Sequence, residues 1–369
     1  MRFFLAAAVS AAVIVSSPFM GRLQSLLQTN LSTRAYVLVL GGLVAGAILL
    51  AIVAAFQRSR QHRAWRSAAM ALAIAIGVVY TQIMATGVAT TDAVERVHFI
   101  EYGAIAVLFY RVWRRIGDPS TIVLPLLCGI AVGTVDEWVQ WFIPYRVGEA
   151  HDVLLNLTSL ACGVLFGIAL EPPPSFSWRP QPASVTRMGI AGAVVVLLFA
   201  GFVNSVHLGH QIDVAGLGRF LSRYSLGELE ALQRDREVRW QSNPPVGISR
   251  LSREDQYLDE AIWHVRERNR LWASQDATGA WHENLILERF FSPVLDRPTY
   301  VSPTGTRWPP EHRADAAGRA TPNAAFVSRA EAQPIMTWPR GGFWTAVMAL
   351  VAALLAVTVR PALRTDRWR

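Results

Sequence analysis

The sequence predicts an all-α polytopic membrane protein of about eight transmembrane helices, with a mainly helical extracytoplasmic domain inserted before the last span. Composition is the first reason: 52% of the 369 residues are hydrophobic and only 17% are charged, against about 25% charged in a typical soluble domain. Distribution is the second, because the apolar residues form long blocks separated by short, arginine-bearing segments. The third is that the arginines alternate between rich and poor loops along the chain.

The apolar blocks follow one another at lengths close to the roughly 20 residues that cross a bilayer. They are Phe3–Ser17, Ala35–Phe56, Ala68–Gly87, Val97–Trp113, Thr121–Phe142, Val153–Leu170, Met188–Val206 and Gly342–Val359. The first is short and follows Arg2, which is also how a cleaved signal peptide begins. Its Ala-Val-Ser-Ala-Ala motif lies inside the apolar stretch rather than after it, so we favour an uncleaved span.

The arginine distribution predicts the orientation. Loops around residues 58–66, 111–115 and 179–187 and the C-terminal 360–369 carry two to four arginines each, whereas the alternate short loops carry one or two. The positive-inside rule then places both termini in the cytoplasm and residues 207–340 on the opposite side of the membrane. Since the arginines lie in these loops, the net charge of +8 is no sign of nucleic-acid binding.

These boundaries divide the chain into five parts. We expect N-terminal helices and a basic loop at 1–67, a four-helix core at 68–170, a linker and the seventh helix at 171–206, an extracytoplasmic domain at 207–340, and a final helix with a basic tail at 341–369. The turns at residues 90–97 and 143–152 are expected to face the outside of the cell, on the same side as the 207–340 domain.

Ionisable residues inside the core blocks are the candidate functional site, because a charge in hydrocarbon is costly and usually functional. Residues three or four apart share a helix face, which groups His98 with Glu101 and Tyr102, Asp136 with Gln140, and Asp152 with Asn156. Arg96 and Arg146 are the candidate counter-ions. The predicted polar pocket comprises Asp92, Arg96, His98, Glu101, Tyr102, Asp136, Glu137, Gln140, Arg146, Asp152 and Asn156.

The alternative is that these residues snorkel to water and cap their helices. Asp152 alone fits this second interpretation, as a carboxylate at a helix start. Glu101 and the Asp136–Glu137 pair lie further in, which favours a functional role.

The same residues carry a family resemblance. His98-x-x-Glu101-Tyr102, Asp136-Glu137-x-x-Gln140-x-Phe142-x-Pro144-x-Arg146 and Asp152-x-x-x-Asn156 together resemble the VanZ-like family of bacterial membrane proteins, over about residues 69–170. Asp92 and Arg96 match the acidic and basic residues that the family has upstream. Where the family often has glycine three residues after the asparagine, this chain has Ser159, and Gly163 keeps the next small position. The resemblance implies an outer-leaflet site and carries over no reaction; the family's link to glycopeptide resistance is not extended to this chain.

The 207–340 region resembles no family that we recognise. Its apolar periodicity predicts helices over Leu217–Trp240, Asp255–Ser274 and Ala280–Phe291, the second capped by Ser252-x-x-Asp255, followed by an irregular Pro-rich stretch over Pro293–Arg340. A metal site could be drawn from His264, Glu267, Arg268, Asn269, His282, Glu283 and Glu288, but no metal-binding spacing is present. A solvated amphipathic face with one or two interhelical pairs is the preferred interpretation.

Two functions fit these observations. One is a non-enzymatic envelope accessory whose pocket binds a lipid-linked or anionic envelope ligand, such as a cell-wall precursor. The other is an enzyme acting on such a precursor, with Glu101, Asp136 or Glu137 as acid or base. A proton-coupled transporter is disfavoured because no inverted repeat is evident. We expect membrane lipids as partners and no metal or cofactor; the residues leave the catalytic question and the oligomeric state open.

Overall fold

The computed structural model describes two compact units. Unit 1 comprises Met1–Gln140, Gly148–Phe202 and Trp344–Arg369, and unit 2 comprises Trp141–Val147 and Val203–Phe343. Within them the described residues are 1–58, 63–83, 85, 87–143, 148, 150–247, 253–321, 324–331 and 334–365.

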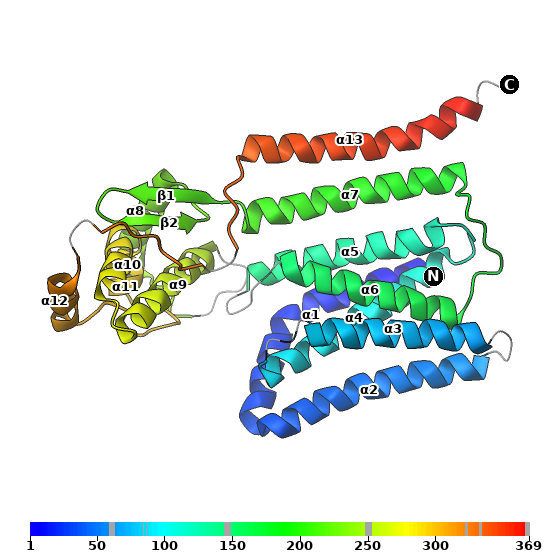
Figure 1. Ribbon diagram of the computed structural model, residues 1–369, viewed down its shortest axis with the longest axis horizontal. Helices are drawn as coiled ribbons and strands as arrows, with labels where there is room; N and C mark the ends of the chain where they lie inside the picture. The colour runs from blue at the N-terminus through cyan, green and yellow to red at the C-terminus, as the bar shows by residue number, and fades with distance from the viewer. Residues whose placement is uncertain are drawn as a thin grey trace. The chain divides into compact units, whose positions relative to one another are not determined.

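Unit 1 is built from long helices (Figure 1). They are α1 (Arg2–Asn30), α2 (Thr33–Arg58), α3 (Arg63–Ile83), α4 (Ala89–Trp113), α5 (Ser120–Trp141), α6 (Ala150–Leu170), α7 (Pro182–Val206) and α13 (Arg340–Thr365). Each predicted apolar block coincides with one of them, although α3 ends four residues before the predicted end of the third block and α5 one residue before that of the fifth. Helix α1 is much longer than its block and continues past Pro18.

Seven helices among the described residues are long and apolar enough to cross a membrane, and α4 is the long helix outside that set. The reason is its charge: Asp92, Glu95, Arg96, Glu101 and Arg111 all lie on it. The prediction of an eighth span therefore rests on the length of α4, 25 residues, and on its neighbours. It packs against α1, α2, α3 and α6.

The closest helix pair is α4 with α6. A Cβ atom built on Gly163 of α6 would lie 2.3 Å from the carbonyl oxygen of Gly103 of α4, and one on Gly167 would lie 2.7 Å from the ring of Tyr110. Such small residues four apart let two backbones touch, which is how helices gain contact in lipid, where burying apolar side chains brings little. We call this contact of Gly163 and Gly167 with Gly103 and Tyr110 the α4–α6 seam; it fixes the position of α6 along α4.

Arginines gather at one end of unit 1. Arg66 of α3 is buried and donates to the last carbonyls of α6, from Nε to Ala169 at 2.5 Å and from a terminal nitrogen to Leu170 at 3.0 Å. Arg111 pairs with Glu171 at 3.0 Å, just after α6. These contacts satisfy carbonyls that a helix end leaves without partners.

Unit 2 combines a hairpin with a helical layer. Its elements are β1 (His210–Val214), β2 (Gly218–Ser222), α8 (Leu226–Ser242), α9 (Arg253–Ala273), α10 (Ala277–Phe290), α11 (Ser292–Asp296) and α12 (Pro310–Arg319). The strands are antiparallel, with His210 opposite Ser222 and Val214 opposite Gly218. Buried aromatic and aliphatic side chains fill the core between the hairpin, α8, α9 and α10.

The hairpin corrects the sequence prediction of a helix over Leu217–Trp240. Gly216 and Gly218 adopt φ values of +80° and +103°, which a helix does not allow and a tight turn requires. The helix starts only at Leu226, where Ser225 and Glu228 form a reciprocal capping box. Unit 2 is therefore mainly helical rather than all-α.

The other predictions for this region fare differently. Helices α9 and α10 match the predicted helices to within three residues at each end. The proposed cap Ser252 lies outside the described residues. The predicted irregular stretch over Pro293–Arg340 contains α12, a ten-residue helix that begins at Pro310, where proline's fixed φ favours the first helical turn.

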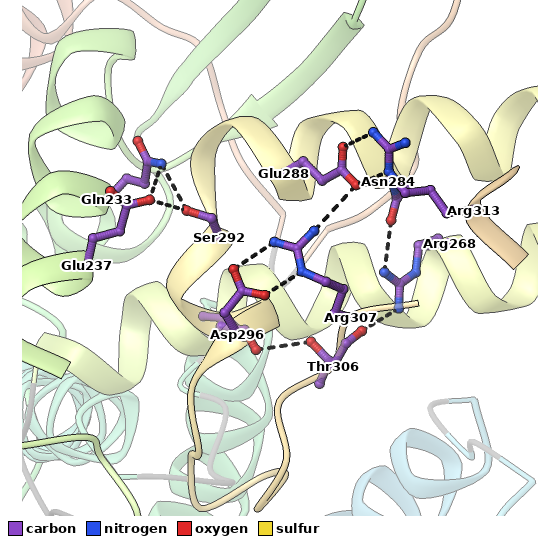
Figure 2. A network of polar contacts seen from close by, with 11 residues as sticks. Gln233, Glu237, Arg268, Asn284, Glu288, Ser292, Asp296, Thr306, Arg307 and Arg313 are labelled. Carbon is purple, nitrogen blue, oxygen red and sulfur yellow. Dashed lines mark hydrogen bonds and ion pairs between the residues drawn. The ribbon is translucent and has the colours of Figure 1, made fainter. Parts of the chain in front are cut away.

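An ion-pair network holds α12 and the preceding loop to α9 and α10 (Figure 2). Arg313 of α12 donates to both carboxylate oxygens of Glu288, at 2.7 and 3.0 Å. Arg307 contacts Glu288 at 3.5 Å and donates to Asp296 at 2.7 Å. Beneath them Arg268, 2% exposed, donates to Asn284 at 3.1 Å, and its burial lowers its pKa to about 10.

Candidate functional site

The central contact of the candidate site joins α4 to α5. Tyr102, fully buried, donates its hydroxyl hydrogen to Oδ2 of Asp136 at 2.9 Å. The helical spacing places Tyr102 on the α4 face that also carries Ile105, Phe109 and Tyr110, all buried. Burial of this apolar face positions the Tyr102 hydroxyl next to the Asp136 carboxylate.

The last turns of α5 present three polar side chains. The amide of Gln140, one turn after Asp136, donates to Oδ2 of Asp136 at 2.9 Å and contacts Oε1 of Glu137 at 3.5 Å. All three are buried, at 2 to 4% exposure. One Asp136 oxygen thus receives two hydrogen bonds, from a phenol and an amide.

Asn156 of α6 completes the cluster from the third side. A Cβ atom built on Gly133 would lie 3.2 Å from Nδ2 of Asn156 and 3.3 Å from the ring of Tyr102. The absent side chain of Gly133 is what lets these two approach. Nδ2 of Asn156 and the hydroxyl of Thr134 are both buried and have no hydrogen-bond partner within the part of the chain that the structure describes.

We name Tyr102, Thr134, Asp136, Glu137, Gln140 and Asn156 the polar cluster. Five of the six belong to the predicted pocket. Thr134 and the spacer Gly133 were not predicted. The signal available in the sequence was Gly129-x-x-x-Gly133, a small-residue pair four apart on the helix that carries the carboxylates.

The remaining predicted residues lie at other places. His98 and Glu101 pair with each other at 3.2 Å, each about a quarter exposed. Asp92 and Asp152 occupy the first turns of α4 and α6, where the helix dipole favours a carboxylate. Arg96 lines an apolar cavity between helices.

Arg146, the predicted counter-ion of the carboxylates, lies outside the described residues. So does the Pro144 position of the predicted motif.

The chemistry of the polar cluster is that of a hydrogen-bonding site with anionic character. Carboxylates accept from hydroxyl and amide groups, while the Asn156 amide and the Thr134 hydroxyl can donate. No group of three metal-ligating side chains is found among the residues described.

The histidines and carboxylates of unit 2 from which a metal site could be drawn form separate contacts with other groups. His264 of α9 contacts Glu283 of α10 at 2.7 Å, and both are almost completely buried. Ser328 donates to the other oxygen of Glu283, and Nδ1 of His282 lies 2.8 Å from the carbonyl oxygen of Leu217. Of these contacts, the one between His264 and Glu283 joins two helices, as the preferred interpretation expects, but it is buried and does not form part of a solvated face.

Comparison with known proteins finds a match in the first part of the chain. The family model described as VanZ/LLP1 matches residues 3–171, from the first helix to the residue after α6. This region is wider than the motif-bearing part and takes in α1 and α2. No family model matches the rest of the chain. No curated protein and no solved structure matches the chain.

Proposed function

We propose that this membrane protein with a VanZ/LLP1 region is an accessory of the bacterial cell envelope, and that its polar cluster binds the polar headgroup of a lipid-linked envelope precursor. The observation that carries the proposal is the amide of Asn156. It is 2% exposed, its Nδ2 has no partner within the described residues, and it adjoins Tyr102 across Gly133.

An unpaired buried donor costs about 1–3 kcal/mol, so a protein keeps one where a ligand pairs with it. Here the donor stands beside carboxylates, which accept hydrogen bonds from hydroxyls. A headgroup that offers both acceptors and hydroxyl donors, as a sugar does, complements this arrangement.

The placement of charges supports an outer-leaflet position for the cluster. The cluster belongs to the middle of α4, the second half of α5 and the first half of α6. Arg66 and Arg111 lie at the other end of the bundle, by Ala169 and Glu171. If the arginine end is cytoplasmic, the cluster faces outward, and residues 207–340 are extracytoplasmic with both termini inside. A periplasmic reporter inserted at the exposed Val246 should be active; activity of a cytoplasmic reporter there would overturn this topology.

The binding proposal is tested by native mass spectrometry of the full chain purified with its lipids. Asn156→Ala should lower the amount of sugar-bearing polyprenyl lipid that co-purifies by up to about tenfold, the contribution of one hydrogen bond. Thr158→Ala is the matched control on the same helix, because its hydroxyl donates to the carbonyl of Leu154 one turn earlier. Equal lipid in wild type and Asn156→Ala would refute the proposal.

A second candidate, an enzyme acting on the same precursor class, is favoured by one contact. Gln140 touches both Asp136 and Glu137, so two carboxyl groups are held side by side, as an acid–base pair requires. An enzyme would lose turnover in Glu137→Gln while keeping normal membrane abundance. A purely structural latch would lose abundance instead.

A further inference from the structure

A cavity of about 760 Å³ lies between α2, α3, α4 and α6 of unit 1. Its volume is within the roughly 300–1,000 Å³ of known small-molecule sites. On α4 it is lined by the stripe Arg96, Ile100, Gly103, Val107 and Arg111. That stripe is turned by about 140° from Tyr102 around the helix axis, so the cavity is a different place from the polar cluster.

The walls of the cavity are mostly apolar and combine large side chains, such as Phe99 and Phe166, with glycines and alanines. Gly41 and Ala47 of α2, Ala73 and Gly77 of α3 and Ala104 of α4 all line it. A Cβ atom built on Gly41 would meet nothing within 4 Å. The space exists because these positions lack side chains large enough to fill it.

One end of the cavity is polar. Arg96 lies there with Thr81 and Gln82, from the last turn of α3. Arg96 is half-buried and makes no ion pair or hydrogen bond with the residues that the structure describes. Arg111, at the other end of the cavity, is paired with Glu171 at 3.0 Å. Arg96 is therefore a cation at the mouth of an apolar space. A bound anion would offset the free-energy cost of holding its charge away from water.

The length of the cavity suits an acyl chain as the occupant. The 15 residues from Arg96 to Arg111, which line it on α4, span about 22 Å. The apolar part, from Phe99 to Leu108, covers about 14 Å, close to one leaflet of a roughly 30 Å hydrocarbon core.

We propose that this cavity binds one acyl chain of an anionic phospholipid, with its phosphate held by Arg96. The guanidinium matches phosphate oxygens in a bidentate geometry, and the apolar walls take the chain. The inference goes beyond the proposed function: it needs the membrane setting and not the polar cluster.

The test uses the full chain in nanodiscs of equal phosphatidylglycerol and phosphatidylcholine, released and analysed by native mass spectrometry. Wild type should retain phosphatidylglycerol over phosphatidylcholine by about five- to tenfold, the contribution of one charge-assisted contact. Arg96→Gln should abolish this preference while lipid stays bound. Arg34→Gln, at an exposed position of α2, is the matched control and should keep it.

A second pair of variants tests the cavity itself. Gly41→Phe should reduce bound lipid about tenfold, while Gly42→Phe, also without neighbours within 4 Å but outside the cavity, should not. If Gly41→Phe fails to fold, Ala47→Leu is the second filling variant. Asn156→Ala should leave the phosphatidylglycerol preference unchanged, which separates this site from the polar cluster.

Three results would overturn the proposal. They are an undiminished preference in Arg96→Gln, full lipid retention in both filling variants, and equally tight binding of water-soluble glycerol phosphate. A change in oligomeric mass without loss of lipid in Gly41→Phe would assign the space to a second copy of the chain, and so would also refute it.

Discussion

Units 1 and 2 pack their helices by opposite means. The α4–α6 seam of unit 1 relies on missing side chains, since Gly163 sits against the backbone of Gly103. The α9–α10 layer of unit 2 relies on large ones, with Tyr257 and Phe291 at 5.1 Å between ring centroids and Phe290 fully buried. In hydrocarbon an apolar side chain gains little by leaving lipid, so close backbone contact is what remains. In water, burying ring area stabilises strongly.

The polar contacts of the two units differ as well. Unit 2 matches arginine with carboxylate, as Arg313 and Arg307 do with Glu288. In the polar cluster of unit 1, Asp136 accepts from a phenol and an amide. The first arrangement fastens segments together; the second offers hydrogen-bonding groups, which suits ligand binding.

The largest effect is expected from removing a ring of the unit 2 core. Phe290→Ala should destabilise unit 2 by about 3–5 kcal/mol through lost burial and a cavity. Faster hydrogen exchange in α9 and α10 would report it. Val238→Ala, at an exposed site of α8, is the control. A small effect would mean that unit 2 does not depend on its aromatic core.

The converse change tests the seam of unit 1. Gly163→Ala adds one methyl group 2.3 Å from the carbonyl oxygen of Gly103, which should force the helices apart and cost about 2 kcal/mol or more. Gly42→Ala, which meets nothing, should be neutral or slightly stabilising. Thermal unfolding in detergent compares the two. Equal melting temperatures would show that the seam can relax without loss.

A pH-dependent effect is expected at Asp255 of unit 2. Burial raises the pKa of this carboxyl to about 6, with repulsion from Glu254 and Asp259 adding to it and a hydrogen bond with Tyr300 opposing it. Because the folded pKa exceeds the unfolded one, the group destabilises unit 2 increasingly as the pH rises from about 4 to 6.

Asp255→Asn should therefore stabilise unit 2 by about 1–2 kcal/mol at pH 7.5 and have almost no effect at pH 3.5. Hydrogen exchange of α9 at the two pH values measures it. The same gain at both would assign the effect to packing rather than charge.

The smallest effect is expected from the exposed ion pairs of Figure 2. Arg307 and Asp296 are both 42% exposed, and solvent screens such pairs, so Arg307→Gln should cost at most about 1 kcal/mol. A loss of several kcal/mol in α12 protection would show that this network, and not the aromatic core, holds unit 2 together.

Prediction from sequence succeeded where one pattern dominates. Apolar length located the long helices of unit 1, and the three- and four-residue spacing placed Tyr102, Asp136 and Asn156 on faces that the structure brings together. It failed at the hairpin, where Gly216 and Gly218 take positive φ values that helical periodicity in the following residues concealed. It also grouped Arg96 with the polar cluster, although Arg96 lies on a different face of α4 from Tyr102 and lines the cavity instead.

The sequence by itself determined that this chain has long apolar helices, which of them carry polar residues, and where its VanZ-like motifs lie, because these depend on local composition and on the fixed period of the helix. The tertiary structure decided which polar residues meet. Only the packing of three helices around Gly133, and of four around the cavity lined by Gly41 and Arg96, fixes what surrounds each side chain. Those distances depend on contacts between residues far apart in the chain, and no local pattern encodes them.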